Sequence, residues 1–149
     1  MSDTKRSRLR VFVDTNVIIS AILSQTSVSA RFLHFVILEH ELLICSYTLE
    51  EIHRVFERKF PDRISLWQTF LSALKYELIE TPKELSRVNS VQIRDVHDVP
   101  ILGSALLCKP DYLVTGDHDF FTEEIMSKFQ VNSPAIFLEK YSNQNGSMN

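Results

Sequence analysis

Short apolar runs recur along the chain, and each is followed by a polar residue or a turn. The runs cover residues 11–13, 42–45, 112–114, 135–138 and, most weakly, 78–79. Runs that are apolar at successive positions are typical of strands buried on both faces of a parallel sheet. The sequence therefore predicts four or five strands.

Helical spacing of apolar residues marks the segments between these runs. The predicted helices cover residues 17–23, a segment around 30–39, and residues 48–59, 64–76, 100–106 and 122–128. Strands that alternate with helices call for a parallel sheet covered on both faces. The predicted fold class is therefore α/β, a three-layer α/β/α arrangement around a central parallel sheet of four to five strands.

The chain is expected to form one domain with flexible ends. Its 149 residues suffice for one ordinary hydrophobic core, and no internal repeat or linker interrupts them. We expect a flexible basic arm over residues 1–8, the domain over 9–140 and a flexible Asn- and Ser-rich tail over 141–149. A polar connection spans residues 81–98.

Composition narrows the possible classes of protein. Hydrophobic residues make up 44% of the chain and charged residues 23%, which excludes a disordered or fibrous protein. Only 3 glycines occur, which argues against a Gly-rich phosphate loop. Cys45 and Cys108 have no metal-ligand or disulfide spacing, and no apolar run is long enough to span a membrane. A cytoplasmic protein that does not bind membranes is the expectation.

Acidic residues occupy the positions where a parallel sheet binds ligands. Asp14 directly follows the run 11–13, and Asp117 follows the run 112–114 after a short turn. Because the carboxyl ends of parallel strands share one edge, both carboxylates should lie there. Asp98 precedes the helix that starts near Pro100 and is a third candidate for this edge.

The helix over residues 48–59 supplies a fourth acid. Glu50 lies opposite the apolar stripe and four residues before Arg54, which suits an exposed ion pair. Glu51 borders the stripe and is the better candidate for the site. Carboxylates drawn together repel one another unless a cation neutralises them, and carboxylate oxygens favour Mg²⁺ or Mn²⁺ over Zn²⁺. Such a site points to phosphodiester chemistry.

Simpler interpretations stand beside this one. Asp is a favoured helix cap, so Asp14 and Asp98 could each merely cap the helix that follows. His97 and His118 are best explained as solvated loop or turn residues. The net charge of −3 also means that any binding of a nucleic acid needs local basic residues or a bound metal ion.

Four segments in order resemble the PIN domain family, and the resemblance covers about residues 9 to 140. The segments are Val11-Phe12-Val13-Asp14-Thr15-Asn16, Ser46-x-x-Leu49-x-Glu51-Ile52, Arg94-Asp95-x-x-Asp98 and Tyr112-Leu113-Val114-Thr115-Gly116-Asp117-x-Asp119. The chain is most similar to the stand-alone prokaryotic PIN proteins that are described as toxins of toxin–antitoxin pairs.

The resemblance implies a Mg²⁺- or Mn²⁺-dependent nuclease, usually an endoribonuclease that hydrolyses RNA. By position, the metal-binding acids would be Asp14, Glu51, Asp98 and Asp117, with Asp119 as a further catalytic acid. Asn16 and Thr115 match polar motif positions that support the acids. Asp95 competes with Asp98 for the third acidic position, because Val99-Pro100 replaces the polar residues that many relatives have there.

The resemblance also implies protein partners. An antitoxin protein would be expected to cover the acidic crevice, and a homodimer could use the apolar residues Phe32, Phe35 and Val36, which would otherwise be core. Apart from the resemblance, substrate phosphates could be bound by basic residues, namely Lys5, Arg6, Arg8, Arg10 or Arg94. The amino-terminal segment could equally be a solvated tail.

Two other functions compete with the nuclease. The first is a non-catalytic PIN-fold module that binds RNA or a protein partner. The second is an aspartyl phosphatase, which is disfavoured because Asn16 occupies the place of its second acid.

Overall fold

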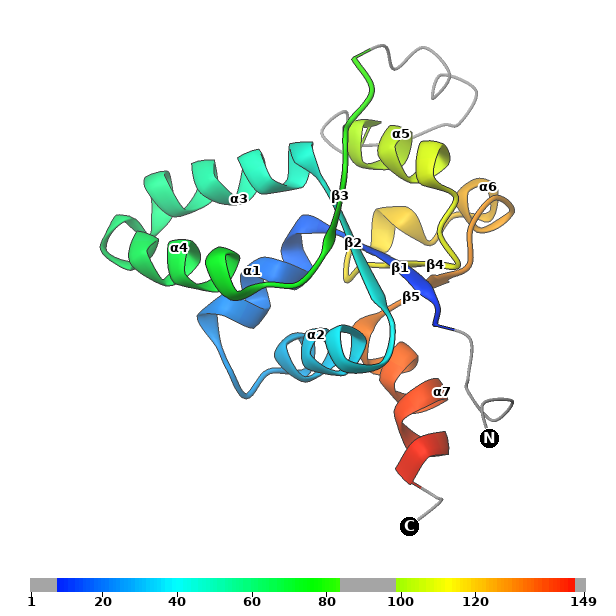
Figure 1. Ribbon diagram of the computed structural model, residues 1–149. Helices are drawn as coiled ribbons and strands as arrows, with labels where there is room; N and C mark the ends of the chain where they lie inside the picture. Colours follow the sequence, from blue (N-terminus) through cyan, green and yellow to red (C-terminus); the bar gives the residue numbers. More distant parts are fainter. Residues whose placement is uncertain (1–7, 84–98, 147–149) are drawn as a thin grey trace.

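A five-stranded parallel sheet forms the centre of the protein in the computed structural model, which describes residues 8–83 and 99–146 (Figure 1). The strands are β1 (Arg10–Val13), β2 (Glu41–Cys45), β3 (Glu77–Ile79), β4 (Tyr112–Val114) and β5 (Val131–Asn132). Their order is β3-β2-β1-β4-β5, so β1 is the middle strand. The predicted α/β class with a parallel sheet of four to five strands is confirmed.

Helices cover both faces of this sheet. The α-helices are α1 (Thr15–Leu23), α2 (Val28–Glu39), α3 (Ser46–Lys59), α4 (Ile64–Ala73), α5 (Val99–Cys108), α6 (Glu123–Met126) and α7 (Pro134–Gly146). The described residues also form two short 3₁₀ helices, η2 (Pro61–Arg63) and η5 (His118–Phe120). The predicted helices are therefore found, although α4 ends three residues before the expected boundary because the chain is extended at Leu74.

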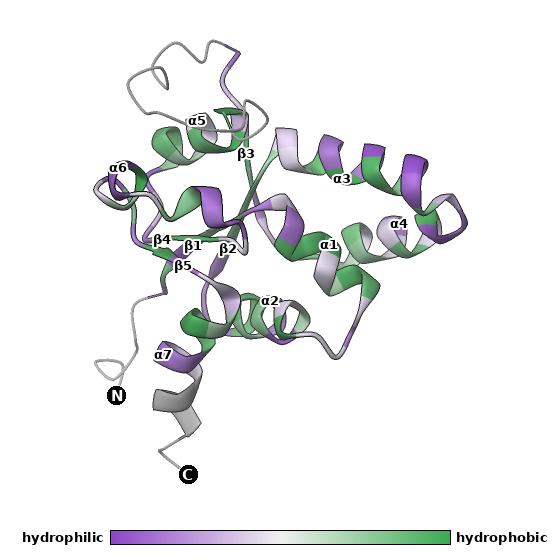
Figure 2. Ribbon diagram, turned by 180° about the vertical axis from the view of Figure 1, so that it is seen from behind, coloured by the Kyte–Doolittle hydropathy of each residue, from purple (hydrophilic) through white to green (hydrophobic). Residues whose placement is uncertain are grey.

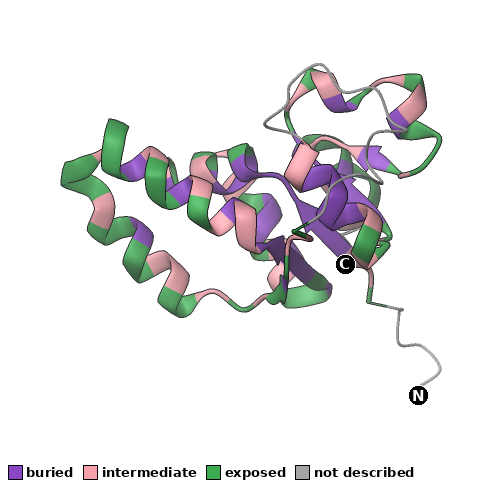
Figure 3. Cartoon of the chain, turned by 90° about the horizontal axis from the view of Figure 1, so that it is seen from above, coloured by how far each residue is buried: buried purple, intermediate pink, exposed green. Residues whose placement is uncertain are grey.

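Alternation along the strands divides the hydrophobic core in two. Val11 and Val13 point to a first core that is shared with α1, α2, α3, α4 and α7. Phe12 points to a second core that is shared with α5, α6 and η5. This is the two-sided burial that successive apolar positions require. Figure 3 shows the strands as a buried band between the more exposed helices, and Figure 2 shows α5 as mostly hydrophobic.

The prediction of a strand over residues 135–138 is wrong. These residues lie in α7, and β5 precedes them. Pro134 suits the first helical position, and the Ser133 hydroxyl accepts a hydrogen bond from the Ile136 amide at 3.2 Å. The helix also extends over residues 141–146 of the predicted flexible tail.

Helix α7 is held to the first core by Phe137, which is fully buried. The Phe137 ring lies 5.4 Å from that of Phe32 and 5.3 Å from that of Tyr112, both edge to face. Phe32 and Val36 are also fully buried in this core, and Phe35 packs against it. These side chains of α2 thus serve the core of the protomer.

The length and hydropathy of the described helices bear on membrane insertion. None of those within residues 8–83 and 99–146 is both long and apolar enough to cross a membrane by itself. Only α1 and α2 taken together pass the test of length and composition, and they meet at a bend of 108°.

Candidate active site

The ends of β1 and β4 bring Asp14 and Asp117 to the same edge of the sheet. The two strands pair in parallel with Val13 opposite Val114, and the Asp14 amide donates to the Val114 carbonyl at 3.1 Å. The Thr115 hydroxyl donates to Asp14 Oδ2 at 2.7 Å and accepts from the Asp117 amide at 3.0 Å. The expected meeting of the two acidic segments is confirmed, and Thr115 is the residue that links them.

Glu51 joins the group through Thr15, the first residue of α1. The Thr15 amide donates to Asp14 Oδ1 at 2.7 Å, and the Thr15 hydroxyl donates to Glu51 Oε1 at 2.7 Å. The neighbouring Glu50 has a side chain that is 70% exposed, and it lies 3.9 Å from Arg54. The choice of Glu51 as the acid on the site side of α3, and of Glu50 as a partner in an exposed ion pair, therefore agrees with the geometry.

Burial gives Asp14 unusual electrostatics. The residue is only 2% exposed, and this burial raises the pKa of its carboxyl from 3.8 to about 6. The hydrogen bonds from Thr115 and Thr15 lower the pKa again, whereas the negative charges of Asp117 and Glu51 add to the rise. The three carboxylates therefore share one electrostatic field, and a cation placed among them would relieve both burial and repulsion.

Asp119 and Asn16 flank this group. The Asp119 amide donates to Asp117 Oδ1 at 2.9 Å, so Asp117 caps η5 and holds the loop that carries Asp119. His118 is exposed on the same short helix, in keeping with a turn residue. Asn16 is exposed on the first turn of α1. The polar contact predicted from that part of the motif is made by Thr15, which precedes it.

Thr15 is the functional residue that the sequence argument missed. It is 4% exposed, and it connects Asp14 to Glu51. A hydroxyl residue directly after a strand-ending acid, at the start of an apolar helix, was the available signal. The capping interpretation of Asp14 also holds, because this residue is the N-cap of α1.

Some predicted site residues lie outside the described part of the chain. They are Lys5, Arg6, Arg94, Asp95, His97 and Asp98. Within residues 8–83 and 99–146, no three Asp, Glu, His or Cys side chains are placed to hold a metal ion by themselves. The choice between Asp95 and Asp98 as the third acid therefore stays a prediction.

The proposed phosphate contacts Arg8 and Arg10 lie at the wrong edge of the sheet. Arg10 begins β1, whereas Asp14 follows its end, about 13 Å further along the strand. The Arg10 side chain lies 3.8 Å from Glu77 and 3.4 Å from the Cys108 carbonyl. The Arg8 guanidinium donates to the His40 carbonyl at 2.6 Å. Both arginines are thus engaged in contacts at the amino edge.

The donor set of the site fits a hard divalent cation. Asp14, Glu51 and Asp117 offer carboxylate oxygens, which are the preferred ligands of Mg²⁺ and Mn²⁺. Mg²⁺ keeps several waters and is usually held by only one or two carboxylates together with substrate phosphates, so a closed cage of three protein ligands is not required. The buried and costly carboxylate of Asp14 is the specific observation that matches such an ion.

A hollow lies elsewhere on the surface. A cavity of about 660 Å³ is lined by the carboxyl-terminal half of α1 and by parts of α2 and α4. Its lining includes Ile22, Leu33 and Phe70 but none of the acids above. It is therefore separate from the acidic site.

A family model described as PIN domain matches residues 10–119. No curated protein sequence matches the chain significantly.

Solved structures share the fold at low sequence identity. VapBC2 from Rickettsia felis, bound to a DNA fragment from their promoter, aligns with a TM-score of 0.65 and 19% identity over 83% of this chain and 97% of that one. DNA-bound VapBC from Salmonella typhimurium aligns with a TM-score of 0.62 and 19% identity. The alignment covers 85% of this chain and 98% of that one. FitAcB from Neisseria gonorrhoeae aligns with a TM-score of 0.60 and 15% identity. The alignment covers 84% of this chain and 98% of that one.

Proposed function

Since the chain belongs to the PIN domain family, we propose that it is a Mg²⁺- or Mn²⁺-dependent nuclease that hydrolyses phosphodiester bonds of RNA. One observation carries the proposal. Asp14 is buried in a hydrogen-bonded group with Thr15, Glu51, Thr115 and Asp117, and its ionisation is costly. A positive partner would stabilise such a group at neutral pH, and the ion that suits its oxygens is one that also binds phosphate.

The positions of Asp14, Glu51 and Asp117 support the roles proposed for them. Asp14, Glu51 and Asp117 would hold the ion, and Asp98 is proposed as a fourth ligand. When bound, the ion supplies Lewis-acid chemistry, which lowers the pKa of water and stabilises negative charge on phosphate oxygens. Each Asp14 oxygen accepts one hydrogen bond, which fixes the carboxylate and leaves a lone pair on each oxygen for a ligand.

Proton transfer is assigned to the remaining acid. Asp119 is half-buried and is carried on the loop that the Asp117 carboxylate caps. It would accept a proton from the attacking water, which is the task of a general base. No nucleophile from the protein is needed in this scheme.

A toxin role and an antitoxin partner are part of the same proposal. They are supported by the resemblance of the sequence to stand-alone prokaryotic PIN proteins and by the shared fold with VapBC and FitAcB. The antitoxin would cover the acidic edge of the sheet with a basic side chain. Growth arrest on expression, relieved by the product of a neighbouring reading frame, is the expected result, and harmless overexpression of an active nuclease would contradict it.

Cleavage of a labelled single-stranded RNA tests the enzyme directly. The wild type should cut in Mg²⁺ or Mn²⁺ and not in EDTA, and Asp14→Asn should cut no faster than the wild type in EDTA. Asp62→Asn, which changes an exposed acid on η2, is the matched control and should retain activity. Equal cleavage by wild type and Asp14→Asn would refute the proposal, and a DNA strand of the same sequence tests the preference for RNA.

A further inference from the structure

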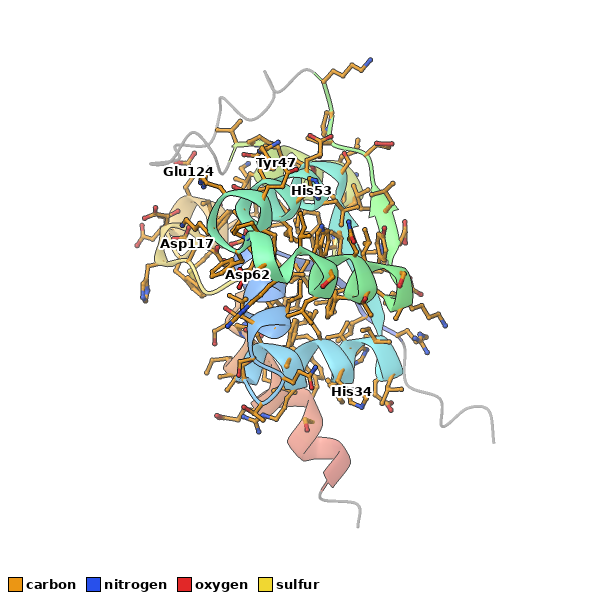
Figure 4. All side chains as sticks on the ribbon, turned by 90° about the vertical axis from the view of Figure 1, so that its left-hand side faces the viewer. His34, Tyr47, His53, Asp62, Asp117 and Glu124 are labelled. Atoms are coloured by element: carbon orange, nitrogen blue, oxygen red, sulfur yellow. The ribbon has the colours of Figure 1, made fainter. Side chains whose placement is uncertain are left out.

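An arginine and a tyrosine make a cation–π contact on the helix that carries Glu51. The Arg54 guanidinium carbon lies 5.7 Å from the centre of the Tyr47 ring. Both residues belong to α3, the helix that also carries Glu51. In Figure 4, Tyr47 on α3 and Asp117 on the loop after β4 both lie in the upper part of the view.

The helical positions of the three residues place this contact at the rim of the site. Tyr47, Glu51 and Arg54 are spaced by four and then three residues, so they share one face of α3. The opposite flank of Glu51 faces Thr48 and Ile52, which are fully buried. Around the circumference of α3, Glu51 therefore lies between the buried face and the Tyr47–Arg54 pair.

The Arg54 side chain is directed toward the amino end of α3. Tyr47 precedes Arg54 by seven residues, about 10 Å along the helix axis. The guanidinium can reach that ring only by folding back toward the amino end of α3, past the level of Glu51. The amino end of α3 follows the carboxyl end of β2, at the edge of the sheet where Asp14 and Asp117 lie.

The charge of Arg54 is available to a ligand. Its side chain is 53% exposed, and its ion pair with Glu50 is long at 3.9 Å. An exposed pair of this kind in one helix is weak and is screened by salt. A planar guanidinium that is held on an aromatic ring presents a fixed fork of donors, which suits a phosphate oxygen pair.

We propose that Arg54, positioned by Tyr47, binds a backbone phosphate of the substrate strand next to the phosphate at the acids. This inference rests on the proposed nuclease function. It meets a specific need, because a group of acids on a chain of net charge −3 repels a nucleic acid and requires a nearby cation. Arg8 and Arg10 do not meet it, since they lie at the opposite edge of the sheet.

The test measures binding of a labelled single-stranded RNA in EDTA as a function of salt concentration. Arg54→Gln should bind about fivefold more weakly at about 0.1 M salt, and the slope of log K against log salt should be smaller by about 0.7, the value for one lost phosphate contact in a single strand. Arg54→Lys should keep the slope of the wild type. Tyr47→Leu should weaken binding and Tyr47→Phe should not, because only the ring is required.

Arg31→Gln on α2 is the matched control, since it removes an exposed charge from a helix that carries none of the site acids. Urea unfolding of each variant shows whether it is folded. Equal affinity and slope for Arg54→Gln and Arg31→Gln would overturn the inference, as would a wild type that does not bind the strand. If cleavage depends on metal but Arg54→Gln binds RNA like the control, the nuclease proposal is supported and the Arg54 contact is refuted. Arg54-dependent binding with no cleavage would support the contact and refute the nuclease.

Discussion

Replacing the buried carboxylate by its neutral isostere, Asp14→Asn, should stabilise the metal-free protein at neutral and alkaline pH. Asp14 is 2% exposed, and burial raises its carboxyl pKa from 3.8 to about 6. A difference of about two pH units corresponds to about 3 kcal/mol, because each unit is worth about 1.4 kcal/mol. This free energy is the cost of keeping the ionised carboxylate in the folded protein.

The direction of the pH dependence follows from the two pKa values. The folded protein binds this proton more tightly than the unfolded chain, because the pKa is higher in the folded state. The wild type therefore loses stability from this group as the pH rises from about 4 to about 6, and the full cost of about 3 kcal/mol remains at higher pH. The variant has no such loss.

The net gain is smaller than the electrostatic cost. The new amide oxygen can still accept from the Thr15 amide, but the amide nitrogen meets the Thr115 hydroxyl, which must turn its own proton elsewhere. This change costs about 1 kcal/mol. We expect Asp14→Asn to be more stable by about 2 kcal/mol at about pH 8, and to show no gain near pH 4.

Urea unfolding in EDTA at several pH values measures the difference between variant and wild type. The exposed Asp62→Asn should stay within about 0.5 kcal/mol of the wild type at every pH. Added Mg²⁺ should narrow the difference for Asp14→Asn, because an ion bound to the ionised carboxylate stabilises only the wild type. A variant that is less stable than the wild type at about pH 8, or a difference that does not change with pH, would refute the reasoning.

Three further predictions concern the core, the site and a thiol. Phe137→Ala should lower the free energy of unfolding by about 3–5 kcal/mol, because the ring is fully buried, and an unchanged urea midpoint would show that α7 is not held by it. Thr115→Val should raise the pKa of Asp14 above about 6, because the Thr115 hydrogen bond lowers it. NMR titration of the Asp14 carboxyl measures this pKa, and an unchanged value would contradict the prediction. Burial raises the pKa of the Cys108 thiol to about 11, so iodoacetamide should modify this thiol much more slowly in the native protein than in urea. Equal rates of modification, measured by mass spectrometry, would argue against a buried thiol at this position.

The sheet and the acids at its edge could be predicted because one physical rule governs both. A strand buried on two faces must be apolar at successive positions, so its end is visible where the first acid appears. Asp14 after β1 and Asp117 after β4 are therefore located by the same pattern that locates the strands. Parallel pairing then brings them together without any further information.

The identity of α7 could not be predicted from so short a run. Four apolar residues at 135–138 fit a strand and a buried helix equally well by periodicity. The decisive features were Pro134 at the first helical position and the cap by Ser133, together with Tyr141, which continues the helical face of Phe137. These residues favour a helix only because its apolar face packs into the first core, and this packing is visible only in the tertiary structure.

The role of Thr15 depended on three-dimensional packing in the same way. Its hydroxyl is directed to Glu51, a residue 36 positions away, because α1 and α3 lie against each other. A buried threonine and a solvent-exposed one look alike in the sequence. The exposed neighbour Asn16 was accordingly the more visible, and less informative, polar residue of the motif.

The middle position of β1 in the sheet has a consequence for the timing of synthesis. Thr115, which completes the hydrogen bonds of Asp14, is added 101 residues later. At about 5–20 residues per second, a ribosome needs about 5–20 s to make that stretch of chain. Until β4 emerges, one edge of β1 is open and the carboxylates are not assembled. Any activity of the site therefore begins only after the ribosome has synthesised β4 and released it for pairing with β1.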